Sequence, residues 1–192
     1  MYNSRERIVY APTVIFETKL QFGETYLKNI AKTLQEIPDR QNRTTRVKAQ
    51  MSEWHLWDEP SAIGCQNILI RIQNHAEAFY TKYYGHPVPT PDGTIKVDKI
   101  KMYNAWSLVY NKGDYATKHN HGGKSIISFA YYVQTDKDDS AINFTTMPTQ
   151  SIQPENDLLV MFPSYLEHWV EPQQSENKRI VISGNFQVDE DE

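Results

Sequence analysis

The spacing of hydrophobic and polar positions changes near the middle of the chain. Before residue 96, two stretches carry apolar residues three or four positions apart, the spacing of an amphipathic α-helix. They cover residues 23–37 and 61–84, and each is followed by a helix-ending sequence, Pro38 and residues 85–87. A short apolar stretch at residues 14–16 is typical of a β-strand. The first part of the chain is therefore predicted to be one strand and a helical scaffold.

The second part has the pattern of a β-sheet. Short runs rich in Val, Ile, Tyr and Phe alternate with clusters of Gly, Asn, Asp and Pro. The predicted strands cover residues 99–111, 125–134, 141–145, 157–162, 168–171 and 179–188. Short strands preceded by helices favour an α+β protein, a double-stranded β-helix (jelly roll, cupin-like) with helices packed on one face.

We interpret residues 1–192 as a single domain, with the N-terminal strand and helical scaffold in residues 1–96 and the jelly-roll core in residues 97–188. Residues 86–93, rich in Pro and Gly, mark the passage between the two parts. The mouth of such a barrel is the place where a ligand is expected to bind.

Composition narrows the class of protein. The net charge is −4, from 20 basic and 24 acidic residues, so no large positive field is available and we expect no nucleic-acid partner. The single cysteine, Cys65, cannot form an intramolecular disulfide, which fits a reducing, cytoplasmic setting. No apolar run approaches the about 20 residues of a membrane span, so we also expect no membrane partner.

Three histidines form the candidate metal site. His119 and His121 lie two positions apart at a strand edge, where residues i and i+2 point to the same face, so both imidazoles can reach one ion. His168 follows a predicted strand and would add a ligand from elsewhere in the sheet. Neutral imidazole suits iron, zinc, copper and nickel alike. The alternative is that the three are ordinary polar residues near a loop.

Arg179 opens the last predicted strand, eleven residues after His168, and would lie at the barrel end beside the histidines. Its planar fork of donors suits a dicarboxylate, because it can hold one carboxylate while a metal chelates the other end. The alternative is a surface arginine that pairs with Glu171 or Glu176.

The order of these residues resembles a known family, the 2-oxoglutarate- and Fe(II)-dependent oxygenases of bacteria and their phages, which are distant relatives of the prolyl 4-hydroxylases. The similarity covers residues 99–186 and extends weakly to residues 11–16. The motifs that carry it are Tyr110-x-x-Gly113, His119-x-His121, Ser128-x-x-Tyr131-Tyr132-Val133, Phe162-Pro163-Ser164 with His168, then Arg179 and Asn185-Phe186.

By this resemblance His119 matches the first iron ligand, His168 the distal histidine and Arg179 the residue that binds the far carboxylate of 2-oxoglutarate. Tyr110 and Ser128 are weaker candidates for lining that pocket. His121 stands where the best-studied members carry Asp or Glu. A neutral imidazole there leaves the site one unit more positive and weakens the selection of Fe(II) over zinc, nickel or copper.

The resemblance implies a 2-oxoglutarate-dependent dioxygenase-like enzyme with Fe(II), 2-oxoglutarate and O2 as cofactors. It would bind a small-molecule co-substrate and hydroxylate an unidentified substrate, for which a peptidyl side chain of a protein or peptide is one candidate. Its setting would be the cytoplasm of a bacterium or a phage-infected cell. Two alternatives stay open: a zinc-dependent hydratase or hydrolase with a three-histidine site, and a non-catalytic jelly-roll structural module.

Overall fold

The structure is a computed structural model that describes residues 13–40, 46–85, 88–89, 95–96 and 98–189. Its helices are α1 (Glu24–Glu36), α2 (Gln66–Tyr83) and the short 3-10 helices η1 (Leu56–Asp58) and η2 (Pro60–Cys65). Its strands are β1 (Phe16–Lys19), β2 (Val47–Lys48), β3 (Gln50–Met51), β4 (Val88–Pro89), β5 (Ile95–Lys96), β6 (Ile100–Tyr110), β7 (Tyr115–His119), β8 (Ile127–Gln134), β9 (Ile142–Phe144), β10 (Gln150–Ile152), β11 (Leu158–Pro163), β12 (His168–Val170) and β13 (Arg179–Val188).

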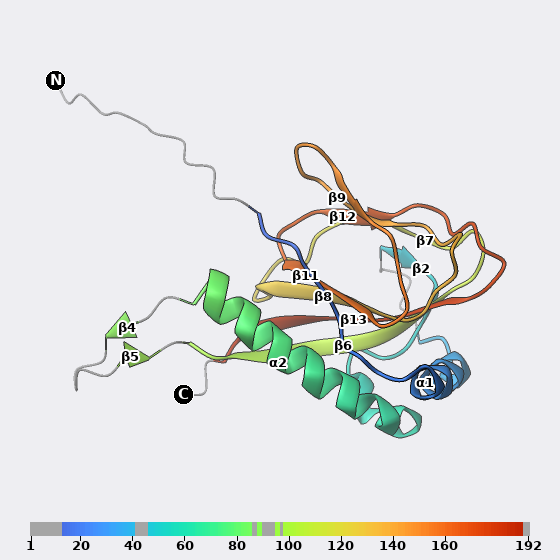
Figure 1. Ribbon diagram of the computed structural model, residues 1–192, viewed down its shortest axis with the longest axis horizontal. Helices are drawn as coiled ribbons and strands as arrows, with labels where there is room; N and C mark the ends of the chain where they lie inside the picture. Colours follow the sequence, from blue (N-terminus) through green and yellow to red (C-terminus); the bar gives the residue numbers. More distant parts are fainter. Residues whose placement is uncertain (1–12, 41–45, 86–87, 90–94, 97, 190–192) are drawn as a thin grey trace.

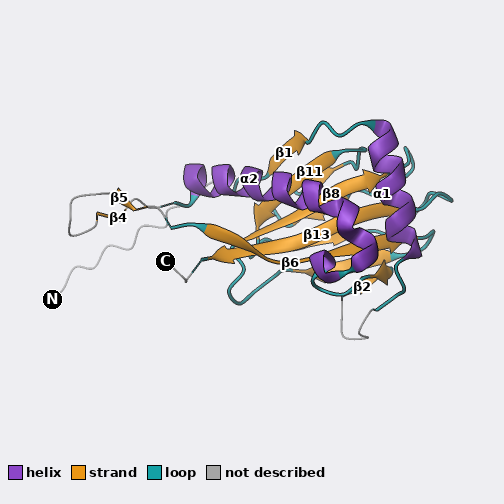
Figure 2. Ribbon diagram, turned by 90° about the horizontal axis from the view of Figure 1, so that it is seen from below, coloured by secondary structure: helices purple, strands orange, loops and turns teal. Residues whose placement is uncertain are grey.

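Two antiparallel sheets form the body of the described chain. The larger has the order β1-β11-β8-β13-β6-β3, and the smaller the order β10-β9-β12-β7-β2. Figure 1 shows the smaller sheet lying opposite the larger one. Figure 2 shows α1 and α2 together across the outer face of the larger sheet. The sheets are mostly antiparallel, and the predicted combination of β-sheet with helices on one face is confirmed (Figure 2).

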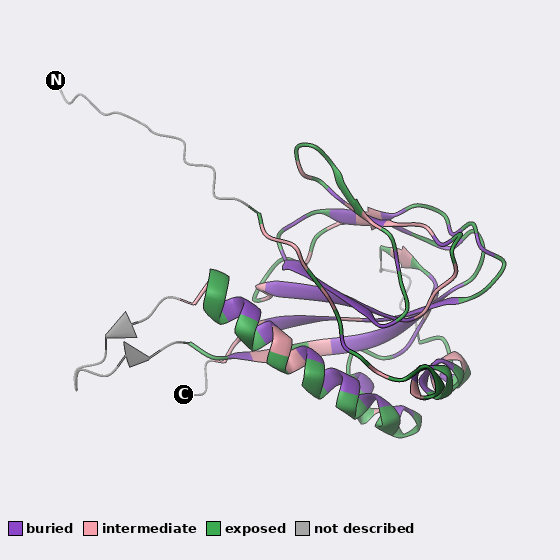
Figure 3. Ribbon diagram, viewed as in Figure 1, coloured by how far each residue is buried: buried purple, intermediate pink, exposed green. Residues whose placement is uncertain are grey.

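The larger sheet has a hydrophobic core on each of its faces. Along β13, Ile180 and Ile182 pack with the helices, while Val181 between them packs toward the smaller sheet. This alternation follows from the period of two in a strand, and it explains the unbroken apolar run of residues 180–182 in β13. Both helices turn their buried side to the sheet (Figure 3), α1 with Leu27 and Leu34.

The sequence predicted both α-helices and the strands β6, β8, β9, β11, β12 and β13 close to their observed bounds. The predicted second helix begins as the 3-10 helix η2 and becomes α-helical only at Gln66. The predicted N-terminal strand begins two residues later than expected, at Phe16, and residues 11–12 lie outside the described chain. Most of residues 86–93, the predicted passage between the two parts, lies outside it too.

The first part of the chain contributes strands as well as helices. β1 pairs with β11, β3 with β6, and β2 with β7, so segments from before residue 97 extend both sheets. The pattern missed β2 and β3 because two-residue strands carry no periodicity. The interpretation of residues 1–192 as one domain stays a prediction. None of the helices within the described ranges has the length and apolar character needed to cross a bilayer.

Candidate metal centre

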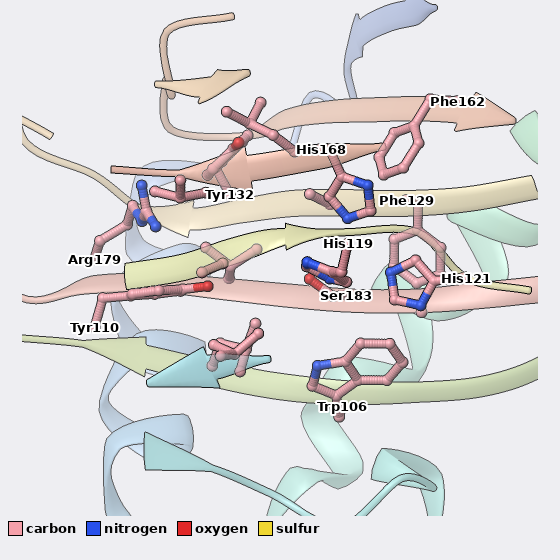
Figure 4. Close-up of a pocket in the computed structure, with 18 residues that line it drawn as sticks. Trp106, Tyr110, His119, His121, Phe129, Tyr132, Phe162, His168, Arg179 and Ser183 are labelled. Carbon is pink, nitrogen blue, oxygen red and sulfur yellow. The ribbon is translucent and has the colours of Figure 1, made fainter. Parts of the chain in front are cut away.

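Sheet register brings His119 and His168 together, and His121 lies beside them. β7 and β12 are neighbours, and His119 pairs directly with His168, so their ring centroids lie 4.4 Å apart. The ring centroid of His121 lies 5.1 Å from that of His119 and 5.2 Å from that of His168. One potential ligand atom from each histidine lies within 4.8 Å of the others (Figure 4). This spacing allows all three to coordinate one ion.

His121 reaches the cluster by a different route from the one predicted. The sequence argument placed it on the same strand face as His119, but β7 ends at His119 and His121 lies in the following loop. The backbone N–H of His121 donates to the carbonyl of Ser164, at 2.8 Å. This long-range bond, rather than strand alternation, holds the loop beside the other two rings.

Hydrogen bonds fix the protonation of two of the rings. Nδ1 of His119 lies 2.6 Å from the carbonyl oxygen of Thr117, and Nδ1 of His168 lies 3.0 Å from that of Leu166. Because a carbonyl only accepts, each neutral ring carries its proton on Nδ1 and leaves the Nε2 lone pair available. This is the usual arrangement around histidines that bind metal ions.

Burial keeps the histidines neutral. Desolvation lowers the pKa of His119, and the nearby Thr117 carbonyl opposes that change only in part. Desolvation, together with the charge of His119, lowers the pKa of His121 to about 4 and that of His168 to about 3. All three imidazoles are therefore unprotonated at neutral pH, which is the state that a metal ion requires.

The histidines line a cavity between the two sheets. Aromatic and aliphatic side chains make most of its wall, which favours the exclusion of water. Its lining residues are Val47, Trp106, Leu108, Tyr110, Ala116, His119, His121, Phe129, Ala130, Tyr132, Ile142, Phe162, His168, Val170, Arg179, Val181, Ser183 and Gly184 (Figure 4).

Arg179 lies at the opposite end of the cavity from His121 (Figure 4) and is 1% exposed. Its guanidinium carbon lies 4.1 Å from the ring centroid of Tyr110, and Nη1 donates to the carbonyl of Ser140, at 2.7 Å. Its Nε is buried and has no hydrogen-bond partner among the described residues. The Tyr110 side chain and the Asp139 carboxylate also interact with the guanidinium. An anion that pairs with the free donor would offset the cost of burying it. The alternative of a surface arginine is wrong, because the side chain is buried.

A network of buried polar groups positions the carbonyl that accepts from the guanidinium. The sequence analysis did not predict this network. The side chain of Gln173 donates to the carboxylate of Asp139 and accepts from the backbone N–H of Ser140, at 3.2 Å. The Ser140 carbonyl is the group that accepts from Arg179. Burial raises the pKa of Asp139. These contacts fix the position of the carbonyl and hence the direction in which Arg179 points.

Of the two candidates for pocket lining, the structure places only Tyr110 in the cavity wall. The hydroxyl of Ser128 donates to Oδ1 of Asn185, at 2.7 Å, and lies 2.8 Å from the hydroxyl of Ser164. The Asn185 amide in turn donates to Oδ1 of Asn104, at 2.8 Å. Ser128 is therefore part of a buried polar network beside the cavity, and Ser164 links that network to the loop of His121.

Tyr132 is a lining residue that the sequence analysis did not select. It lies on β8 and is 2% exposed. Burial raises its pKa, and the nearby charge of Arg179 opposes that shift. Strand alternation was the available signal, because Tyr132 shares a strand face with Ser128, already chosen as a candidate.

Comparisons with known proteins agree with this geometry. A sequence model described as "Putative 2OG-Fe(II) oxygenase" matches residues 143–185, which include His168 and Arg179. A search of curated protein sequences gave no match.

Solved structures with the same fold include several 2-oxoglutarate oxygenases. A Pseudomonas putida prolyl-4-hydroxylase is 14% identical, with a TM-score of 0.64 over 90% of this chain and 91% of that one. The viral collagen prolyl hydroxylase of Paramecium Bursaria Chlorella virus-1, in its 2-oxoglutarate complex, is 13% identical, with a TM-score of 0.63 over 90% and 95%. HygX of Streptomyces hygroscopicus, with nickel and 2-oxoglutarate bound, is 9% identical, with a TM-score of 0.62 over 91% and 83%. At these identities the likeness establishes the fold.

The fold and the sequence match point the same way. The resemblance predicted from the sequence is confirmed: a 2-oxoglutarate- and Fe(II)-dependent oxygenase model matches residues 143–185, and the solved structures with the same fold include oxygenases that use 2-oxoglutarate. The side chains fit Fe(II) and 2-oxoglutarate, since three neutral imidazoles converge at one end of the cavity and a buried cation lies at the other.

Proposed function

We propose that this protein hydroxylates a C–H bond of its substrate at the expense of 2-oxoglutarate, with Fe(II) held by His119, His121 and His168. The observation that carries the proposal is one cavity with two complementary ends. One end is a cluster of neutral imidazoles, and the other is a buried arginine whose Nε has no partner in the part of the chain that the structure describes. A dicarboxylate would join the two ends, with one carboxylate at Arg179 and the other end at the metal.

Each residue has a defined task. The Nδ1–H groups of His119 and His168 are held by carbonyls, so Nε2 of each ring is kept free for the ion. Arg179 binds and orients the far carboxylate of the co-substrate, with Tyr110 packed against its guanidinium. Phe162 packs edge-on against His168, with 4.7 Å between ring centroids, and keeps water from that side. The bound iron supplies the oxidative chemistry in which 2-oxoglutarate becomes succinate and CO2.

The sheets are proposed to form the double-stranded β-helix expected from the sequence, since the similar solved structures are oxygenases of this type. A peptidyl side chain is the proposed substrate class. Support comes from similar structures that are named prolyl hydroxylases, one of them from Trichoplax adhaerens in complex with a peptide fragment. Location in the cytoplasm of a bacterium or of a phage-infected cell stays a prediction.

Co-substrate turnover tests the proposal directly. Purified protein is incubated with Fe(II), ascorbate and 2-oxoglutarate, and succinate is measured with and without a chelator. We expect succinate that depends on iron and is lost in Arg179→Ala. A zinc hydratase or hydrolase, or a non-catalytic module, would form none, so the absence of iron-dependent succinate from well-folded protein would contradict the proposal.

A further inference from the structure

The indole N–H of Trp106 is a second unpartnered donor at the cavity. Trp106 lies on β6, is 5% exposed and lines the cavity, with its ring centroid 6.1 Å from that of His121. Its Nε1 is buried and has no hydrogen-bond partner among the described residues. A buried tryptophan N–H normally finds an acceptor, because an unpaired donor has lost its hydrogen bonds to water without replacement. The donor is therefore placed for an acceptor on a ligand.

The orientation of this ring is fixed from outside the cavity. Trp54 packs against it edge to face, with 4.8 Å between centroids and an interplanar angle of 75°. Trp54 is itself held by its carbonyl, which accepts from the backbone N–H of Ala105, at 2.9 Å. Figure 4 shows the nitrogen on the ring edge nearer to Tyr110 and Arg179. The N–H can therefore donate to a ligand atom in the part of the cavity between the arginine and the histidines.

The chemistry of an indole limits what it can bind. The N–H only donates, so its partner must be an acceptor such as a carboxylate or keto oxygen. A dicarboxylate held by Arg179 at one end would bring its other end to this stretch of the cavity. We propose that Trp106 donates a hydrogen bond to the 2-oxo acid end of the co-substrate, an inference that rests on the proposed function. The two ends of the molecule are then bound by different residues.

Binding measurements without turnover test this assignment. Protein loaded with Zn(II) is titrated by calorimetry with 2-oxoglutarate and with 2-oxobutyrate, which has the same 2-oxo acid end but no second carboxylate. Trp106→Phe keeps an aromatic ring and removes the N–H. We expect it to weaken both ligands at least about tenfold, the effect of losing a hydrogen bond to a charged group. Arg179→Ala should weaken 2-oxoglutarate only.

The matched control is Trp54→Phe, which alters the same aromatic pair without removing the donor from the cavity. We expect it to change both affinities less than about twofold. If Trp106→Phe and Trp54→Phe lower affinity equally, ring packing rather than the N–H is responsible and the inference is overturned. Urea unfolding of each variant separates a loss of affinity from a loss of folded protein.

The indole N–H can also be observed directly. The chain has four tryptophans, so a proton–nitrogen correlation spectrum of labelled protein contains four indole signals, and the one absent from Trp106→Phe belongs to Trp106. With Zn(II) present, 2-oxoglutarate should move this signal downfield. A signal that stays in place while Arg179-dependent binding occurs overturns the role of Trp106 and leaves the proposed function standing. If wild-type protein binds no 2-oxoglutarate, both proposals fail.

Discussion

Arg179 and Tyr110 face each other across β13 and β6, and the guanidinium carbon lies 4.1 Å from the centre of the tyrosine ring. Both side chains are buried at the same end of the cavity. The ring gives the guanidinium a flat surface to stack on while its donors stay directed at other partners. This pair therefore forms the end of the cavity at which we propose that the carboxylate binds.

The first prediction concerns this end. Arg179→Ala should weaken 2-oxoglutarate binding by about 1.5–3 kcal/mol, the value of a hydrogen bond to a charged group. Calorimetry with metal-loaded protein measures it. Arg179→Lys is the matched variant, because it keeps the charge but loses the planar fork, and it should recover only part of the affinity. Wild-type affinity in Arg179→Ala would remove the arginine from the site.

The second prediction concerns the metal. Replacing His119 or His168 with Ala should abolish stoichiometric metal binding, because each supplies one of the three converging imidazoles. Elemental analysis of loaded, desalted protein measures the metal content. The control is His55→Ala, since His55 stacks on Trp57 and does not line the cavity. Full metal occupancy in both cavity variants would contradict the site.

The third prediction tests the missing carboxylate. His121→Asp adds a negative charge and a hard oxygen ligand, so it should bind metal and shift the preference from Zn(II) toward Fe(II). Competition between equal amounts of the two ions, followed by elemental analysis, gives the ratio. An unchanged ratio would show that residue 121 does not contribute to the choice of metal.

The fourth prediction concerns pH and the metal-free protein. The pKa of His168 is lowered by burial to about 3, below its ordinary value of about 6.5 in an unfolded chain. Below about pH 6.5, His168 binds a proton in the unfolded state but not in the folded state. Its contribution to the free energy of unfolding is therefore complete at neutral pH and is lost as the pH falls. Urea unfolding should show a decline on the order of 1 kcal/mol per pH unit between pH 6 and pH 4. His168→Gln should make this decline shallower, whereas an identical slope would argue against a buried neutral ring.

The fifth prediction concerns close packing in the cavity wall. A Cβ added at Gly184 would clash with the backbone oxygen of Asn104 and would lie 2.7 Å from the ring of Phe129. Because backbone cannot move aside cheaply, Gly184→Ala should lower the free energy of unfolding by about 1–3 kcal/mol. Gly23→Ala is the control, since nothing lies within 4 Å of its added Cβ. Equal stability of the two variants in urea would contradict this packing.

The sequence by itself determined the elements and the identity of the chemical groups. Apolar residues three or four positions apart predicted α1 and α2, and the apolar runs predicted β6, β8, β11 and β13. These patterns can be recognised because the buried face of a helix or strand needs apolar residues at regular positions. The order of histidines and arginine was sufficient to indicate the class of protein. These signals are local or depend only on the order of residues along the chain.

Only the tertiary structure decided which groups meet. The pairing of His119 with His168 and the stacking of Arg179 on Tyr110 join residues far apart in sequence through sheet register. A loop hydrogen bond joins His121 to Ser164. Register also turned Ser128 into a partner of Asn185 and Ser164 rather than a lining residue. Trp106 could not be selected from the sequence, since an unpartnered N–H is a property of its surroundings and not of the residue.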